Sequence, residues 1–101
     1  MKCMADLCVI PVGQGVSVAE EVTRCERILL SFPIETQLHA YGTNLYGEWD
    51  DVFAAIKACH EQLHDAGVVR ISSTIRVGTR TDKAQTFADK INAVENRLQQ
   101  D

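Results

Sequence analysis

The chain has 101 residues, of which 46% are hydrophobic, as expected for one globular domain spanning residues 1–101. Its formal net charge of −4 argues against a nucleic-acid partner, because binding to phosphates requires a basic surface. No stretch approaches the ~20 apolar residues that span a membrane, and Asp6 interrupts the short apolar run near the N-terminus. We therefore expect a cytoplasmic protein that binds neither nucleic acid nor membrane.

The first predicted element is a strand over residues 3–13. Its side chains alternate between two faces, and Asp6 is its single charge. One face carries Ala5, Leu7, Val9 and Pro11, and the other carries Met4, Asp6, Cys8, Ile10 and Val12. Because Pro11 has no N–H to donate to a ladder, we expect regular pairing to be lost near it.

An amphipathic helix is predicted next, from Ser17 to the residue before Pro33. Ser17 and Glu20 are three residues apart and predict a capping box. Apolar residues then recur at spacings of three and four, and the proline disfavours helix at the residue before it. The apolar stripe consists of Val18, Val22, Cys25, Leu29 and Phe32.

A hairpin and a second helix form the middle of the chain. Residues 35–47 predict two strands that turn near Tyr41 and Gly42, where Gly42 offers the positive φ that such a turn often needs. Asp50 is the candidate N-cap of the following helix, and Gly67 is its C-terminal stop. The stripe of this helix consists of Val52, Ile56, Cys59 and Leu63.

The last strand is the longest alternating run. Residues 69–77 alternate strictly and are rich in β-branched side chains, which predicts a half-buried strand. We expect Gly78 to break this strand, and Asp82, with Gln85 three residues later, to cap a third helix. The stripe of that helix consists of Phe87, Ile91, Val94 and Leu98.

The order β-α-β-β-α-β, followed by a helix, predicts an α+β, ferredoxin-like fold. Such a fold has a four-stranded antiparallel sheet with two helices on one face, to which this chain adds a C-terminal helix. The first and last strands are then neighbours, so Asp6 would lie near Arg70 or Arg76, either in an ion pair or holding the amino group of a ligand. The bare face of the sheet is a candidate interface or pocket wall.

One pattern formally matches a zinc site. The run His60-Glu61-Gln62-Leu63-His64 has the H-E-x-x-H spacing, which places two histidines on one helix face. A catalytic zinc of this kind needs a third protein ligand. No further histidine follows His64, and Glu95 is the only glutamate that follows it. The four cysteines form no C-x-x-C pair and are interpreted as buried, reduced thiols. We therefore expect no metal and no other cofactor.

Three segments resemble the thiamine-binding protein family of the YkoF-like superfamily, and its fungal members in particular. They are residues 5–13 (ADLCVIPVG), 39–52 (HAYGTNLYGEWDDV) and 70–91 (RISSTIRVGTRTDKAQTFADKI). The resemblance implies a ferredoxin-like protein with an extra C-terminal helix that assembles as homodimers or homotetramers. It also implies binding of thiamine or its hydroxymethylpyrimidine half in some members. No enzymatic activity is established across the family.

Polar and aromatic residues on these stretches suggest ligand contacts. Carboxylates and hydroxyls can satisfy the edge of an aminopyrimidine, and aromatic rings can cover its face or that of a cationic thiazolium. Alternatively, Trp49 anchors the core or an interface, Asp50 caps a helix and His39 is an ordinary strand residue. The candidate ligand-binding residues are Asp6, His39, Tyr41, Thr43, Glu48, Trp49, Thr74 and Arg76.

Arg80 and Lys83 form a candidate anion-binding group at the start of the last helix. Cations and free backbone N–H groups there could hold a phosphate or carboxylate, or the loop could pair with acidic residues of a partner subunit. Together with these residues, the family resemblance implies a non-enzymatic homo-oligomer that binds a small heteroaromatic ligand of the thiamine type. The alternative is a structural or regulatory oligomer whose polar sheet face serves assembly only. An enzyme is least expected, because no nucleophile–base pair or complete metal set is visible.

Overall fold

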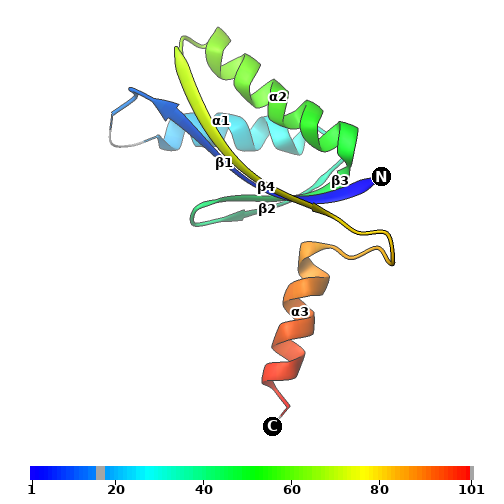
Figure 1. The fold of residues 1–101 in the computed structure, drawn as a ribbon. Coiled ribbons are helices and arrows are strands. Elements are labelled where there is room, and N and C mark those ends of the chain that lie inside the picture. Colours follow the sequence, from blue (N-terminus) through cyan, green and yellow to red (C-terminus); the bar gives the residue numbers. More distant parts are fainter. Residues whose placement is uncertain (16–17, 101) are drawn as a thin grey trace.

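The computed structural model describes residues 1–15 and 18–100. Its elements are β1 (Lys2–Val12), α1 (Ala19–Leu30), β2 (Glu35–His39), β3 (Gly42–Glu48), α2 (Trp49–Asp65), β4 (Arg70–Thr79) and α3 (Phe87–Leu98). The strands form one antiparallel sheet in the order β2-β3-β1-β4, which confirms the predicted ferredoxin-like fold. Figure 1 shows α1 and α2 on one face of the sheet and α3 on the other side. None of the helices in the described ranges has the length and apolarity to cross a membrane.

The core lies between the sheet and the pair α1 and α2. Alternation along β1 turns Cys3, Ala5 and Leu7 toward these helices, and β3 contributes Leu45. Full burial of a large apolar side chain contributes about 1.5–3 kcal/mol, so this layer supplies much of the stability of the fold. The predicted stripe of α2 is confirmed, because its buried residues are Val52, Ala55, Ile56, Cys59 and Leu63.

Two predictions about strand ends were wrong. Pairing of β1 with β4 continues through Pro11, opposite Ile71, to Val12. The missing N–H is tolerated there because β3 pairs with β1 only as far as Leu7, which leaves Pro11 with one neighbouring strand. Gly78 does not break β4 either, since it pairs with β1 before the strand ends at Thr79.

Two of the predicted helix caps were also wrong. Glu48 is the N-cap of α2, so Asp50 lies in the first turn, where its carboxylate faces the positive end of the helix dipole. Thr86 and Asp89 form a reciprocal capping box at the start of α3. Asp82 is therefore not the cap of that helix.

The predictions for the other helix ends and for the hairpin turn had mixed outcomes. Gly67 adopts φ +101° just after α2, as its predicted role as a stop requires. The cap predicted at Ser17 lies outside the described residues. The hairpin turns where expected, but Gly42 does not adopt a positive φ. A Cβ at Gly42 would collide with the backbone oxygen of Leu7, so close approach of β1 is what excludes a side chain.

The outer parts of the sheet and of the chain are less buried than the core. Ile71 packs against the core from the edge strand β4, whereas Val69 is exposed. The helix α3 forms as predicted, but none of its residues is buried. Figure 1 shows α3 extending away from the sheet, with its C-terminal end far from the other helices.

Candidate functional site

The face of the sheet opposite α1 and α2 carries polar side chains from every strand. The register places Asp6 of β1 directly between Asn44 of β3 and Arg76 of β4. Residues opposite each other in an antiparallel pair share a face, so these three side chains belong to one surface. His39 of β2 lies on the same face, because it pairs with Gly42, two residues from Asn44.

Asp6 is held by His39. The Nε2 atom of His39 lies 2.7 Å from Oδ1 of Asp6, across the position of Gly42, which has no side chain. The backbone N–H of Tyr41 donates to Nδ1 of His39 at 3.3 Å, so Nε2 is the nitrogen that donates to the carboxylate. Within residues 1–15 and 18–100, the side-chain partner of Asp6 is His39, so the predicted ion pair of Asp6 with an arginine is wrong.

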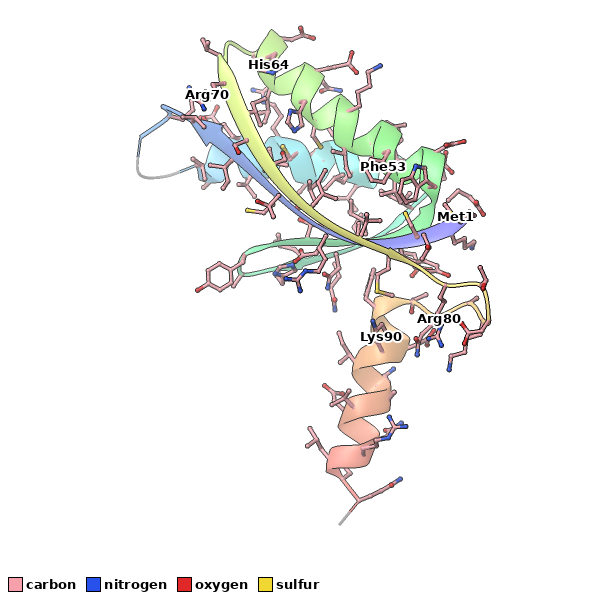
Figure 2. The ribbon with its side chains drawn as sticks, viewed as in Figure 1. Met1, Phe53, His64, Arg70, Arg80 and Lys90 are labelled. Carbon is pink, nitrogen blue, oxygen red and sulfur yellow. The ribbon has the colours of Figure 1, made fainter. Side chains whose placement is uncertain are left out.

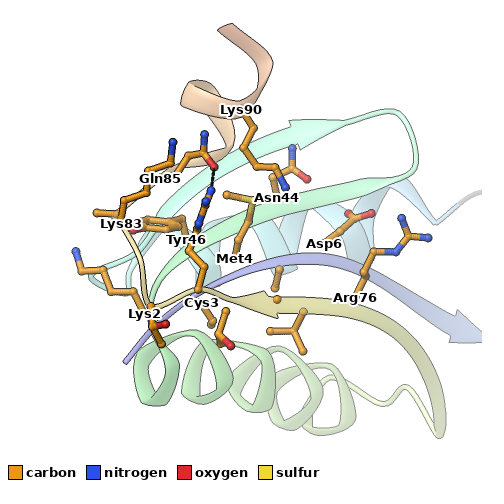
Figure 3. A pocket seen from close by; sticks show the side chains of 17 residues that line it. Lys2, Cys3, Met4, Asp6, Asn44, Tyr46, Arg76, Lys83, Gln85 and Lys90 are labelled. Atoms are coloured by element: carbon orange, nitrogen blue, oxygen red, sulfur yellow. Dashed lines mark hydrogen bonds between the residues drawn. The ribbon is translucent and has the colours of Figure 1, made fainter. Parts of the chain in front are cut away.

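A pocket of about 870 Å³ lies over this surface, between the sheet and the N-terminal end of α3. This volume is within the range of ligand pockets, roughly 300–1,000 Å³. Figure 3 shows side chains of the sheet on one side of the pocket, and side chains from the β4–α3 loop and α3 on the other. The sheet contributes Met4, Asp6, Asn44, Tyr46 and Arg76.

The pocket combines an aromatic ring with polar groups. Tyr46 is only 8% exposed, and the Nζ atom of Lys2 lies 5.5 Å from the centre of its ring. The amide nitrogen of Asn44 donates to Gln37 at 3.0 Å, which fixes the orientation of that amide. The pocket therefore presents an apolar surface beside an oriented amide and the Asp6 carboxylate.

The loop that closes the pocket is held by Arg80. Its Nε and Nη2 atoms donate to the two oxygens of Asp82, each at 2.6 Å, and its Nη1 donates to Gln85 at 2.5 Å. The dashed line in Figure 3 marks the contact with Gln85. These hydrogen bonds from the guanidinium lower the pKa of Asp82 to about 2. Arg80 thus orders the loop while lining the pocket.

The structure brings together part of the predicted site. The predicted residues that line the pocket are Asp6, Arg76, Arg80 and Lys83. His39 is not a lining residue, but it contacts the lining residue Asp6. Met4, which the sequence placed on the candidate pocket wall, lines the pocket too, whereas the lining residues that sequence reasoning missed include Lys2, Asn44, Tyr46, Gln85 and Lys90.

Two of the predicted ligand residues lie on the helix-covered side of the sheet. Thr43 is buried, and its hydroxyl donates to a carboxylate oxygen of Glu26 in α1. Trp49 stacks on Phe53 with ring centroids 4.6 Å apart and packs against the core. This is the anchoring alternative that the sequence left open for Trp49. Neither residue lines the pocket.

Three other predicted residues lie at the margins of the open face. Tyr41 is 88% exposed in the β2–β3 turn. The carboxylate of Glu48 accepts a hydrogen bond from the N-terminal ammonium of Met1 at 3.0 Å. Thr74 lies on the pocket's face of β4, opposite Cys8, but is not among the lining residues.

The two histidines of the H-E-x-x-H pattern each bond to an oxygen. The Nε2 atom of His60 lies 2.7 Å from the hydroxyl of Ser73, and the Nδ1 atom of His64 lies 2.7 Å from the carbonyl oxygen of Val68. Figure 2 shows His64 near the C-terminal end of α2, far from α3. In the part of the chain that the structure describes, no group of three or more His, Cys, Asp and Glu residues is placed to hold a metal.

Comparison with known proteins connects this chain to one family. Residues 5–95 match the family model for the thiamine-binding protein. A UPF0045 protein of Synechocystis sp. is 50% identical over 99 residues, which are 98% of this chain and 82% of that protein. A UPF0045 protein of the fungus Eremothecium gossypii is 40% identical over 99 residues, covering 97% and 94% of the two chains.

Solved structures share the fold. A protein from Methanocaldococcus jannaschii has a TM-score of 0.86 at 29% identity, covering 93% of this chain and 96% of that chain. A Thermotoga maritima protein, whose name assigns it provisionally to thiamine biosynthesis or salvage, has a TM-score of 0.80 at 15% identity, covering 93% and 99%. At that identity the second likeness concerns the fold alone.

Proposed function

The chain belongs to the thiamine-binding protein family, and on that basis we propose that it binds a small heteroaromatic ligand of the thiamine type. The observation that carries the proposal is the pocket on the open sheet face, where an aromatic ring adjoins an amide and a carboxylate. Thiamine and its hydroxymethylpyrimidine half are the ligands that the family name and this chemistry favour.

The lining residues suit an aminopyrimidine. The carboxylate of Asp6 accepts hydrogen bonds from the exocyclic amino group, and the amide of Asn44 bonds to a ring nitrogen. Tyr46 and the thioether of Met4 give the flat ring an apolar surface.

Binding without catalysis is part of the proposal. Cys3 is the cysteine among the residues described as lining the pocket, and it is almost completely buried. Burial, followed by the charge of Glu48, raises the pKa of this thiol, so it stays protonated at neutral pH. A protonated thiol is a poor nucleophile, so Cys3 is not a candidate for nucleophilic catalysis.

Self-association is the second part of the proposal. The apolar stripe of α3 includes Ile91, Val94 and Leu98, which are 41%, 57% and 78% exposed. An isolated helix shorter than about 12–15 residues is marginal in water, so α3 gains stability from a partner that covers its stripe. We propose that this partner is another copy of the chain, in a homodimer or homotetramer. The alternative function is an oligomer whose open face serves assembly only.

Titration calorimetry with thiamine and free hydroxymethylpyrimidine tests the ligand. We expect binding in the micromolar range, about −8 kcal/mol. Asn44→Ala should weaken it about tenfold, because one hydrogen bond to the ligand is worth about 1 kcal/mol or slightly more. Glu61→Gln, on the exposed surface of α2, is the control and should change nothing. If neither compound gave heat, the result would favour the alternative function, an oligomer whose open face serves assembly only.

A further inference from the structure

Positive charge is concentrated in the pocket although the chain as a whole is acidic. Five of the ten Lys and Arg residues line it, against one of the fourteen Asp and Glu residues. The five cations are Lys2, Arg76, Arg80, Lys83 and Lys90, and the one acid is Asp6. Like charges gathered in one concave site repel each other, so an anion held there would be stabilised.

The carboxylates closest in sequence to these cations already have partners. Asp82 accepts two of the three hydrogen bonds that Arg80 donates. Asp89, next to Lys90, accepts the backbone N–H of Thr86 in the capping box of α3. Asp6 is bonded to His39.

Arg80 is held by Asp82, and Lys2 lies over the ring of Tyr46, so three of the five cations are left for a ligand. In the described ranges, 1–15 and 18–100, no salt bridge within 4.0 Å involves Arg76, Lys83 or Lys90. Lys83 comes from the loop and Lys90 from α3, whereas Arg76 comes from β4. Figure 3 shows Lys90 extending from α3 toward the sheet side of the pocket. The pocket thus has cationic groups on both of its sides.

We propose that the pocket takes the phosphate monoester of a small heteroaromatic alcohol, with its phosphate at Lys83 and Lys90. This inference rests on the proposed function and specifies the form of the ligand. Thiamine and hydroxymethylpyrimidine each carry a primary hydroxyl that can bear a phosphate. The ring lies against Tyr46 and Asn44, and the phosphate dianion offsets the excess of positive charge. Arg80 serves mainly to order the loop through Asp82 and Gln85.

Calorimetry at low ionic strength tests this form of the ligand, using thiamine monophosphate, thiamine and inorganic phosphate as probes. We expect the ester to bind about 10- to 100-fold more tightly than either other probe, since charge-assisted hydrogen bonds are the strong ones. Lys83→Gln and Lys90→Gln should each lose about tenfold of affinity for the ester but should not lose affinity for thiamine, because a lysine repels its cationic ring. Lys57→Gln, a matched lysine change on α2, should leave both affinities unchanged.

The possible outcomes separate this inference from the proposed function. Equal affinities for thiamine and its monophosphate would overturn the phosphate inference and leave the proposed function standing. Inorganic phosphate binding as tightly as the ester would also overturn it, because the heterocycle would then contribute nothing. Heat from neither heterocycle would overturn the proposed function, and this inference with it. Thermal unfolding of each lysine variant checks that a lost affinity is not lost folding.

Discussion

At the scale of single residues, the contact between His39 and Asp6 depends on a glycine, Gly42, at the position between them. Gly42 lets β1 approach closely and lets His39 reach Asp6 across the sheet. We predict that Gly42→Ala lowers the free energy of unfolding by about 1–3 kcal/mol, because the new Cβ collides with the backbone oxygen of Leu7. Chemical denaturation measures this. Gly78→Ala is the control, since a Cβ there meets no atom within 4 Å, and an equal loss in both variants would contradict the account.

The Arg80–Asp82 pair gives a prediction about pH. Hydrogen bonds from Arg80 lower the pKa of Asp82 in the folded chain to about 2. Any stabilisation from this group is present above the usual carboxyl pKa and is lost as pH falls through the folded value near 2. Nuclear magnetic resonance titration of the Asp82 carboxyl should give a midpoint near 2, and Arg80→Gln should return it to the usual range. A wild-type midpoint near 4 would show that the pair does not form in solution.

At the scale of elements, α3 is the helix whose apolar stripe lies exposed. We predict that Val94→Asp combined with Leu98→Asp disrupts self-association, because two carboxylates would then be buried in the interface. Sedimentation should show a larger assembly for the wild type and a species near 11.2 kDa for the variant. Asn96→Asp, on the opposite side of α3, is the control and should leave the assembly intact. A wild type that sediments near 11.2 kDa at micromolar concentration would refute the interface.

Element order and core faces were predictable from the sequence, whereas several element ends were not. The buried face of α2 was predictable because its apolar residues recur at spacings of three and four, which places them on one side of a helix. Asp82 has the sequence pattern of a cap, but its carboxylate is taken by Arg80 two residues away. Pro11 has the pattern of a strand breaker, but it tolerates its place because one neighbouring strand has already ended. Such outcomes depend on competing partners that local patterns do not contain.

At the scale of the whole molecule, the residues that line the pocket were harder to predict from the sequence than the fold. Alternation in β3 puts Asn44 and Tyr46 on the same face, so both were within reach of sequence reasoning once Asp6 was noted. Lys90 was not, because it reaches the pocket only through the placement of α3. Thr43 and Trp49 have suitable chemistry for a ligand but lie on the helix-covered side of the sheet. Residue type alone does not distinguish the two faces.

Chemical-shift mapping with thiamine tests the central claim, that the ligand occupies the open-face pocket. Titration of isotope-labelled protein should shift the amide signals of Met4, Asn44, Tyr46 and Lys83, which line that pocket from three different elements of the chain. Signals from the exposed side of α2, such as that of Glu61, should stay in place. Shifts confined to α1 and α2, or no shifts at millimolar thiamine, would contradict the account.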